Sequence, residues 1–343
     1  MAALPVIKHC LQQKPNLAIL LTTTTISAFE VIKDRLPDGI VYQFSPLDTP
    51  GVVDSFLQYW KPTAVFLMES ELWPNLILSA SEKGIAVALL NAHISAKSFK
   101  LWSGPAALPL ISLMLSKFSL IAPLNTQEAI RFQLLQAPPF AISFAGDLKY
   151  AVGDVDISET ESRIVDDLCL QLVNRPIWMA ASVHKGEDEG QIFALLTPLV
   201  DIIGYKLPTL PSSGGTTYSE LRSLYRLTPI AVIGGSFLPG LAGHNIAEAA
   251  AAGCAVLTGP FVGHFSHMVL EMQRSDKMSV IQVSAEELIG ALDMLLSNPK
   301  ALQTHRQAAK QAFLALSSGV VRNVWSLVDA QILKKASLKE NEV

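Results

Sequence analysis

The sequence is poor in charge and in cysteine. Only 16% of its 343 residues are charged and 50% are apolar, whereas soluble proteins carry about 25% charged residues. A disordered chain needs the opposite balance, so disorder is excluded. The 26 basic and 30 acidic residues give a net charge of −4, which offers no polycationic surface to nucleic acid. Three distant cysteines, Cys10, Cys169 and Cys254, argue against a disulfide framework or a four-thiolate metal site.

Long hydrophobic runs are missing too. The strongest run, residues 105–115, is well short of the roughly 20 residues of a membrane-spanning helix, and no spanning segment is expected. Lys97, Lys100 and Lys117 flank it, a pattern that suits a helix lying in a membrane interface. A buried helix with capped ends explains the run equally well. The N-terminus has no signal-peptide pattern, so the composition indicates an intracellular globular protein.

Several common catalytic motifs are absent. No Gly-Lys pair occurs, which excludes a P-loop. No Gly-x-Gly-x-x-Gly follows a strand, which weakens a dinucleotide oxidoreductase. Gly234 to Leu238 misses the nucleophile elbow, because Leu238 stands where the second glycine belongs. His264 and His267 are three residues apart without a third ligand, so we expect no metal site.

What is present is an alternation of short apolar runs and helical patterns, which predicts a parallel α/β architecture. Strands are predicted at 17–25, 64–68, 85–90, 119–123, 176–181, 229–233 and 255–258, and helices at 27–35, 74–83, 126–136, 187–196, 246–252, 285–297 and 302–316. A polar, acidic stretch at 153–161 marks a domain boundary. The pattern breaks twice: the chain begins in a helix where a strand is expected, and 197–218 lacks a strand–helix–strand passage.

The most informative segment is 230–254, where a buried strand leads into a glycine-rich loop. A helix is predicted to start at Asn245, and backbone amides at a helix start favour a phosphate. Glu248 lies three residues on, within reach of a ribose hydroxyl. Asn245 as N-cap with Glu248 at N3 also resembles a capping box, which needs no ligand. Four glycines before the helix exceed what a cap requires, so we favour a ligand.

Three further clusters carry polar groups. Glu69 and Glu71 follow a strand, where open α/β sheets place their ligands, and they share a side if the backbone stays extended; Trp73 with Pro74 offers the alternative of a structural corner. The segment 181–189 sets Ser182, His184 and Lys185 at a helix start. Its acidic residues 187–189 suit a solvated helix N-terminus. In 146–149, expected at the mouth between the domains, Lys149 is suited to neutralise an anionic substrate.

Together these clusters resemble one family, the 3-deoxy-D-manno-octulosonic acid (Kdo) transferases, which move Kdo from CMP-Kdo onto a lipid A precursor. The matching segments are Glu-Ser-Glu-Leu-Trp-Pro-Asn (69–75), Asn-Ala-His-Ile-Ser (91–95), Gly-Asp-Leu-Lys (146–149), Ala-Ser-Val-His-Lys-Gly-Glu (181–187) and Gly-Gly-Ser…Gly-His-Asn…Glu (234–248). They cover most of the chain in the family's order, although the family usually has arginine where His93 stands. Residues 22–29, 116–123 and 263–268 are most similar to the plant members, which are associated with mitochondria.

The resemblance implies a GT-B fold, an α/β glycosyltransferase architecture of two facing Rossmann-like domains. Residues 1–152 correspond to the acceptor-binding domain without its first strand, and 153–330 to an internally shortened donor-binding domain; 331–343 form a charged tail. The implied reaction is an inverting displacement without metal or cofactor. A carboxylate deprotonates a sugar hydroxyl that attacks the anomeric carbon of Kdo, and backbone amides hold the phosphate of the leaving CMP.

The family's functional residues carry over position by position. Those implied to bind the donor are Ser182, His184, Gly234, Gly235, Ser236, His244, Asn245 and Glu248. Glu69, Glu71 and Lys149 are the catalytic candidates, implied to face the Kdo or the acceptor. The implied partners are CMP-Kdo, a lipid A precursor and, through 97–117, a membrane surface, with no nucleic acid. The plant likeness implies a mitochondrial location, although no targeting segment is apparent.

Two departures coincide with the two breaks in the pattern. A His-Ala-x-Ser-x-Gly-Glu segment, whose glutamate is the family's general base, precedes the helix that here begins at Ala2. A Pro-Arg-His segment belongs between Leu196 and Glu220 and does not occur in this sequence. Three hypotheses follow: a shortened Kdo transferase with weak or no activity, a non-catalytic protein that binds CMP or lipid, and another sugar-nucleotide transferase of the same fold.

Overall fold

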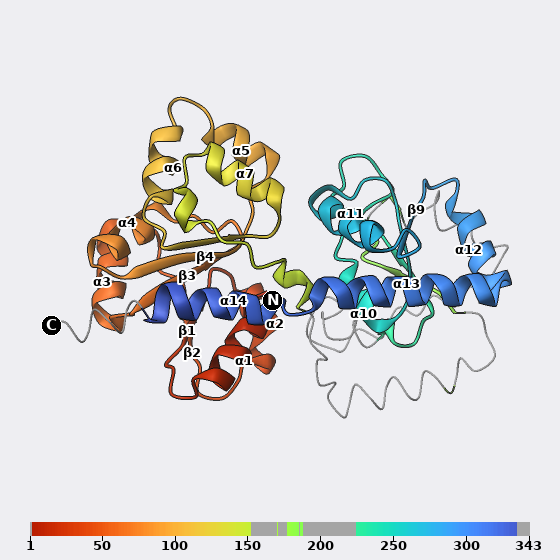
Figure 1. Cartoon of the computed structure of the whole chain (residues 1–343), viewed down its shortest axis with the longest axis horizontal. Coiled ribbons are helices and arrows are strands. Elements are labelled where there is room, and N and C mark those ends of the chain that lie inside the picture. Colours follow the sequence, from red (N-terminus) through yellow and green to blue (C-terminus); the bar gives the residue numbers. More distant parts are fainter. Residues whose placement is uncertain (1, 152–169, 171–176, 185, 188–223, 335–343) are drawn as a thin grey trace. The chain divides into compact units, whose positions relative to one another are not determined.

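A computed structural model of the chain describes residues 2–151, 170, 177–184, 186–187 and 224–334 (Figure 1). The chain divides into two compact units. Unit 1 comprises Met1–Ala151 and Gly319–Val343, and unit 2 comprises Val152–Ser318. The first segment of unit 1 ends one residue before the predicted boundary after residue 152. The prediction placed 319–330 in the second domain, however, whereas these residues belong to unit 1.

Unit 1 is built on parallel strands. β3 (Ala64–Met68), β4 (Ala86–Ala92) and β5 (Leu120–Pro123) form one sheet in that order, and β1 (Leu20–Thr23) pairs with β2 (Val41–Phe44). β4 and β5 are buried along almost their whole length. This explains why they read as continuous apolar runs rather than alternating ones, since helices cover both faces of a parallel sheet.

The described helices of unit 1 are α1 (Ala3–Gln13), α2 (Ile26–Ile32), α3 (Pro50–Trp60), α4 (Pro74–Glu82), α5 (Ala96–Trp102), α6 (Leu108–Leu115), α7 (Thr126–Leu134) and α14 (Val320–Val328). Most of them cover the two faces of the β3–β4–β5 sheet, whereas α2 contacts β1. Val87 and Leu89 of β4 pack with buried residues of α3, α4, α6 and α7. Ala88 and Leu90, which point the other way, pack with α1 and α14. Figure 1 shows this arrangement, with α6 and α7 on one side of β4 and α14 on the other.

The C-terminal helix belongs to unit 1 because of its apolar stripe. Val320, Val324 and Val328 recur at intervals of four and lie on one helix face. All three are buried against the sheet face that α1 also covers. Burial of each large apolar side chain contributes roughly 1.5–3 kcal/mol. The three valines therefore attach α14 to unit 1, although α14 directly follows α13 of unit 2 in the sequence.

The apolar run at 97–117 forms two helices, α5 and α6, separated at residues 103–107. Ile111, Met114 and Leu115 are buried, as a core helix requires. Leu101 and Leu113 remain 68% and 46% exposed, so the other face is available for an external apolar contact. Among the described helices none has the length and apolarity needed to cross a membrane.

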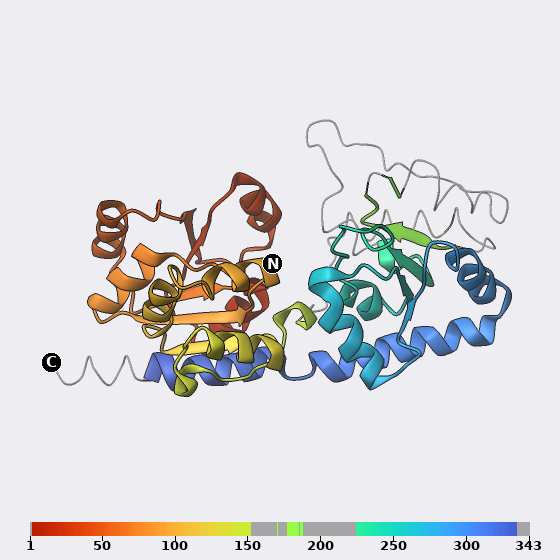
Figure 2. The same ribbon diagram turned by 90° about the horizontal axis from the view of Figure 1, so that it is seen from above.

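Unit 2 contains a second parallel sheet. β6 (Met179–Ala181), β7 (Ile230–Ile233), β8 (Ala255–Thr258) and β9 (Val280–Gln282) lie in sequence order. Ile230, Val232 and Leu257 pack against α12 (Leu288–Ser297). The other described helices are α10 (Ala247–Ala252), α11 (Ser266–Ser275) and α13 (Pro299–Ser317) (Figure 2). The predicted helix 187–196 and the shortened passage 197–218 lie almost wholly outside the described residues.

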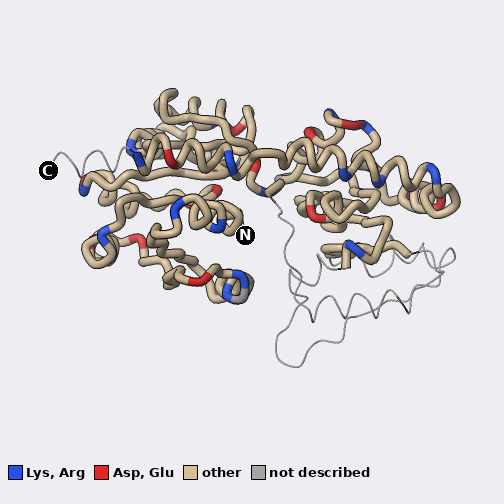
Figure 3. Tube along the Cα trace, turned by 60° about the horizontal axis from the view of Figure 1, so that its bottom comes forward, with Lys and Arg blue, Asp and Glu red and all other residues tan. Residues whose placement is uncertain are grey.

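Charged residues are thinly spread over the described trace. In Figure 3 most of the tube is uncharged, and acidic and basic residues alternate along both units. The described ion pairs are mostly peripheral, such as Lys83 with Asp54 at 2.9 Å.

Candidate functional site

The glycine-rich loop after β7 folds tightly against the loop after β6. At Gly234 a Cβ atom would lie 2.8 Å from the carbonyl oxygen of Ser182, and Gly235 has φ +65°. Both positions therefore require glycine. Ser236 is fully buried; its hydroxyl donates to the Ile233 carbonyl at 2.6 Å and accepts from the Gly259 amide at 2.8 Å. Ser236 thus joins the ends of β7 and β8.

The centre of this arrangement is Glu187, which the sequence reasoning missed. Expected in a solvated helix N-terminus, it is instead fully buried. Its Oε2 accepts from the amides of His184 (2.9 Å) and Gly235 (2.7 Å), and its Oε1 from those of Ser236 (3.1 Å) and Phe237 (3.0 Å). Three amides of the glycine-rich loop therefore hold a carboxylate of the chain itself.

Two histidines meet beside Gly235. The Nε2 atoms of His184 and His244 are 2.8 Å apart, so one ring donates and the other accepts. A Cβ atom on Gly235 would lie 2.7 Å from the His244 ring. Burial lowers the pKa of His244, the neighbouring His184 lowers it further, and the Glu187 carboxylate opposes both. His244 therefore favours its neutral form.

The predicted helix start at Asn245 is wrong by two residues. α10 begins at Ala247, with Ile246 as the N-cap residue. Asn245 Oδ1 accepts from the Ala247 amide at 2.9 Å, a local turn contact rather than an N-cap. The capping-box spacing from Asn245 to Glu248 therefore does not hold, although Glu248 does lie in the first helical turn. Six residues are too few for α10 to act as a phosphate site by its N-terminus alone.

In unit 1, Glu69 and Glu71 follow β3 as predicted, but they are held differently. Glu69 adopts φ +59°, so the extended backbone that would place both carboxylates on one side is absent. Its amide donates to the Leu90 carbonyl at 2.8 Å. Glu71 is exposed and accepts from the indole nitrogen of Trp73 at 2.8 Å. Pro74 begins α4, so the structural corner is also formed.

A second left-handed residue lies at the end of the adjacent strand. Asn91 has φ +52° at an irregularity in β4 and is 1% exposed. Its Oδ1 accepts from the Leu148 amide at 2.8 Å, and Asp147 Oδ1 accepts from the Lys149 amide at 2.8 Å. Asn91 therefore fixes the turn that carries Lys149. Sequence reasoning quoted Asn91 within a motif but gave it no role; asparagine's tolerance of left-handed backbone is the only signal.

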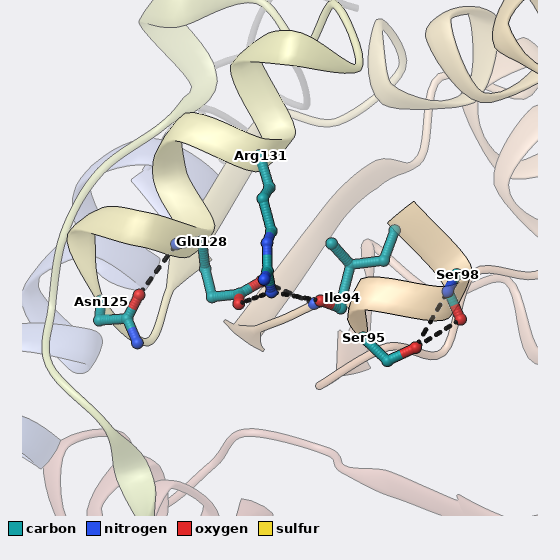
Figure 4. A network of polar contacts seen from close by, with 6 residues as sticks. All are labelled: Ile94, Ser95, Ser98, Asn125, Glu128 and Arg131. Carbon is teal, nitrogen blue, oxygen red and sulfur yellow. Dashed lines mark hydrogen bonds and ion pairs between the residues drawn. The ribbon is translucent and has the colours of Figure 1, made fainter. Parts of the chain in front are cut away.

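The loop after β4 is also held by hydrogen bonds with side chains of α7 (Figure 4). Glu128 Oε2 accepts from the Ile94 amide at 2.7 Å, and Arg131 donates to the Ile94 carbonyl at 2.8 Å. Arg131 and Glu128 also form an ion pair at 2.6 Å. Ser95 caps α5 by accepting from the Ser98 amide. The chain from Asn91 to Ser95 is consequently rigid, which favours a site at this sheet edge.

The structure thus gathers the candidates into two groups, one in each unit. Ser182, His184, Gly234, Gly235, Ser236 and His244 lie on the loops after β6 and β7. Glu69, Glu71 and Lys149 lie at the ends of β3 and on the turn anchored to β4. Within the described ranges no three His, Cys, Asp or Glu side chains form a group that could hold a metal ion.

Comparison with known proteins adds two kinds of similarity. Residues 1–152 match a family model described as 3-deoxy-D-manno-octulosonic-acid transferase (kdotransferase). A probable mitochondrial 3-deoxy-D-manno-octulosonic acid transferase of Arabidopsis thaliana is 50% identical over 98% of this chain and 83% of its own length. A 3-deoxy-D-manno-octulosonic acid transferase of Haemophilus influenzae is 28% identical over 87% of this chain and 76% of its own length.

Solved structures show the fold. The UDP-GlcNAc 2-epimerase of Neisseria meningitidis superposes with a TM-score of 0.64 over 95% of this chain and 96% of its own, at 14% identity. A putative UDP-N-acetylglucosamine 2-epimerase of Listeria monocytogenes gives the same TM-score over 96% and 92%, at 11% identity. The predicted GT-B fold is therefore confirmed, with parallel α/β sheets in both units.

Proposed function

Since the chain belongs to the 3-deoxy-D-manno-octulosonic acid (Kdo) transferase family, we propose that it serves the transfer of Kdo from CMP-Kdo to a lipid A precursor such as lipid IVA. One observation carries the proposal. The loops after β6 and β7 bring His184 and His244 together over Gly235 at the carboxyl ends of parallel strands, where α/β sheets bind their ligands.

Unit 2 is the donor side of this proposal. The histidine pair, which stands over Gly235, offers imidazole N–H groups to the phosphate of CMP. Ser182, which has a left-handed backbone with φ +57°, is proposed to contact the donor from the adjoining loop. Glu248 in the first turn of α10 is proposed to accept from a ribose hydroxyl, as carboxylates do in other nucleotide-binding α/β proteins.

Unit 1 supplies the acceptor side. A carboxylate removes the proton of the acceptor hydroxyl, whose oxygen attacks the anomeric carbon of Kdo from the face opposite the leaving group. The bond from that carbon to the phosphate oxygen breaks, and its electron pair leaves with CMP. Among the residues of this chain, Glu69 is the better candidate for the base because Glu71 is engaged with Trp73. Lys149 is proposed to neutralise the carboxylate of Kdo.

We propose that these 343 residues by themselves turn over weakly or only bind CMP. The Arabidopsis alignment spans 373 positions, more than this chain has, so that relative contains segments without a counterpart here. The Pro-Arg-His segment implied for residues 196–220 is not in the sequence. A general base typically contributes about 10²–10⁴-fold to a rate, so activity depends strongly on which carboxylate serves.

The test is Kdo transfer to lipid IVA, with CMP-Kdo generated in place and products read by mass spectrometry. The 343-residue chain is compared with a version that carries the family's glutamate-bearing segment upstream and the missing donor segment. Transfer by the restored version alone is expected. If both transfer, Glu69→Gln is then expected to abolish the shorter chain's activity. No transfer by either version, together with tighter binding of UDP than of CMP, would replace this proposal by another sugar-nucleotide transferase.

A membrane contact through α5 and α6 is proposed as well. Lys97, Lys100 and Leu101 are exposed on α5, and Leu113 is exposed on α6. This combination suits the interface of an anionic bilayer. We expect Leu101→Ser with Leu113→Ser to reduce cosedimentation with phosphatidylglycerol vesicles, whereas Leu270→Ser, exposed in unit 2, leaves it unchanged. Equal binding by all variants would refute the contact. The name of the Arabidopsis relative supports a mitochondrial location, which imaging of a tagged plant protein tests.

A further inference from the structure

We infer that Glu187 is a positioning residue for donor binding, an internal anion that holds the two donor-side loops together. The inference deepens the proposed function and rests on it for the identity of the ligand. The geometry does not depend on the proposed function, because the contacts of Glu187 are made with other residues of this chain.

The first support is the number and direction of the hydrogen bonds. Each carboxylate oxygen of Glu187 accepts two backbone N–H groups, and all four distances lie between 2.7 and 3.1 Å. One donor belongs to the loop after β6 and three to the loop after β7. Charged acceptors form stronger hydrogen bonds than neutral ones, so this carboxylate is the main polar tie between the loops.

The second support is how closely the loops approach. A Cβ atom on Gly234 would lie 2.8 Å from the Val183 Cα and 3.0 Å from Glu187 Oε2. The two chains are therefore in backbone contact beside the carboxylate. Because His184 and His244 depend on that spacing for their 2.8 Å contact, a change at Glu187 moves the histidines apart.

The third support is that the amides of residues 235–237 are occupied. A phosphate cannot use N–H groups that already donate to a buried carboxylate, since the two anions would repel each other in a medium of low dielectric constant. The donor phosphate is left to the side chains that the loops display. Glu187 thus acts through His184 and Gly235 rather than by touching the ligand.

The variant Glu187→Ala removes a CH2–COO⁻ group, and acetate carries the same atoms with one added hydrogen. We expect the affinity for CMP, measured by calorimetry, to fall by about tenfold or more, in line with the cost of misplacing binding groups. Acetate should restore it, while chloride at equal ionic strength and the larger benzoate should not. Restoration of CMP binding by acetate, but not by the larger benzoate, is a result that a general loss of stability does not give.

Two further variants keep the inference falsifiable if Glu187→Ala folds poorly. Glu187→Gln retains the volume but turns an NH2 group toward two N–H donors, so it should weaken CMP binding without abolishing it. Glu128→Gln changes another buried carboxylate that accepts a backbone amide, that of Ile94 in unit 1, and should leave CMP affinity unchanged. Hydrogen exchange of residues 234–237 should accelerate in the Glu187 variants only.

Opposite results overturn the inference. Tighter CMP binding by Glu187→Ala would show that the amides of Gly235 to Phe237 are the phosphate site and that Glu187 blocks it. Unchanged affinity and unchanged exchange would show that Glu187 positions nothing. If wild-type protein binds no CMP, the proposed function fails, while exchange at residues 234–237 still decides whether Glu187 holds the loops.

Discussion

Replacing Gly259 by alanine tests the packing of the donor-side loops most directly. A Cβ atom there would lie 2.1 Å from the carbonyl oxygen of Ser236 and 2.8 Å from the amide nitrogen of Phe237. Ordinary contacts require about 3.5 Å, so the backbone of the glycine-rich loop must move by about 1.4 Å. No side-chain rotation relieves this clash, because both atoms belong to the main chain.

The magnitude follows from what that movement breaks. Overpacking a close-packed site typically costs about 1–3 kcal/mol. Displacing residues 236–237 also strains two hydrogen bonds to Glu187 and the one from Gly259 to Ser236, worth about 1 kcal/mol each. We expect unit 2 to lose about 3 kcal/mol or more, which corresponds to roughly hundredfold faster hydrogen exchange of globally protected amides.

The assay is hydrogen exchange with mass spectrometry on peptides from β7 and β8, because it reports on unit 2 separately from unit 1. Gly290→Ala is the matched control. Gly290 is an exposed helical residue of α12 with no atom within 4 Å of a Cβ, so alanine should stabilise the unit by up to about 1 kcal/mol. Exchange in Gly259→Ala within threefold of wild type would refute the packing described for this loop.

Three other expectations concern single side chains. Asn91→Ala should destabilise unit 1 by about 2 kcal/mol, because it removes the acceptor for the Leu148 amide at a left-handed position; an unchanged melting temperature would contradict this. Since the folded pKa of His244 is lowered, the unfolded chain binds that proton first. Unit 2 should therefore lose stability as pH falls below about 6.5, and His244→Asn should flatten that slope in urea titrations. Cys254 is buried, its thiol donates to the Tyr225 carbonyl, and burial raises its pKa to about 12. It should resist iodoacetamide until urea unfolds unit 2, and rapid native labelling would contradict this.

The sequence predicts the buried elements well. β3 and β8 were expected at their observed bounds. β8 is buried along its whole length, and a strand covered on both faces shows as an unbroken apolar run. β3 is only partly buried, with Phe66 38% exposed, but its residues also form an unbroken apolar run. β2 was not predicted, since its residues are only partly buried. β9, which has three residues, was not predicted either.

The sequence predicts where the candidate sites lie better than it predicts the contacts within them. Motif positions put the polar residues at the carboxyl ends of strands, and the structure has them there. The role of Glu187 was hidden because its partners are backbone amides, which no side-chain pattern encodes. The acidic neighbours at 188 and 189 made a solvated helix start the simpler interpretation. The left-handed backbone of Glu69, unusual for glutamate, was equally invisible in the sequence.

The placement of α14 also has a consequence for the order in which the protein matures at the ribosome. Val320, Val324 and Val328 cover one face of a sheet whose strands are synthesised some 200 residues earlier. Unit 2 is a single continuous stretch, Val152–Ser318, and is complete before that helix emerges. The N-terminal unit is therefore the last to close, and the part of its apolar sheet face that α14 covers stays exposed to chaperones until that helix emerges. A premature stop codon just before residue 320 would damage the half of the protein that was made first.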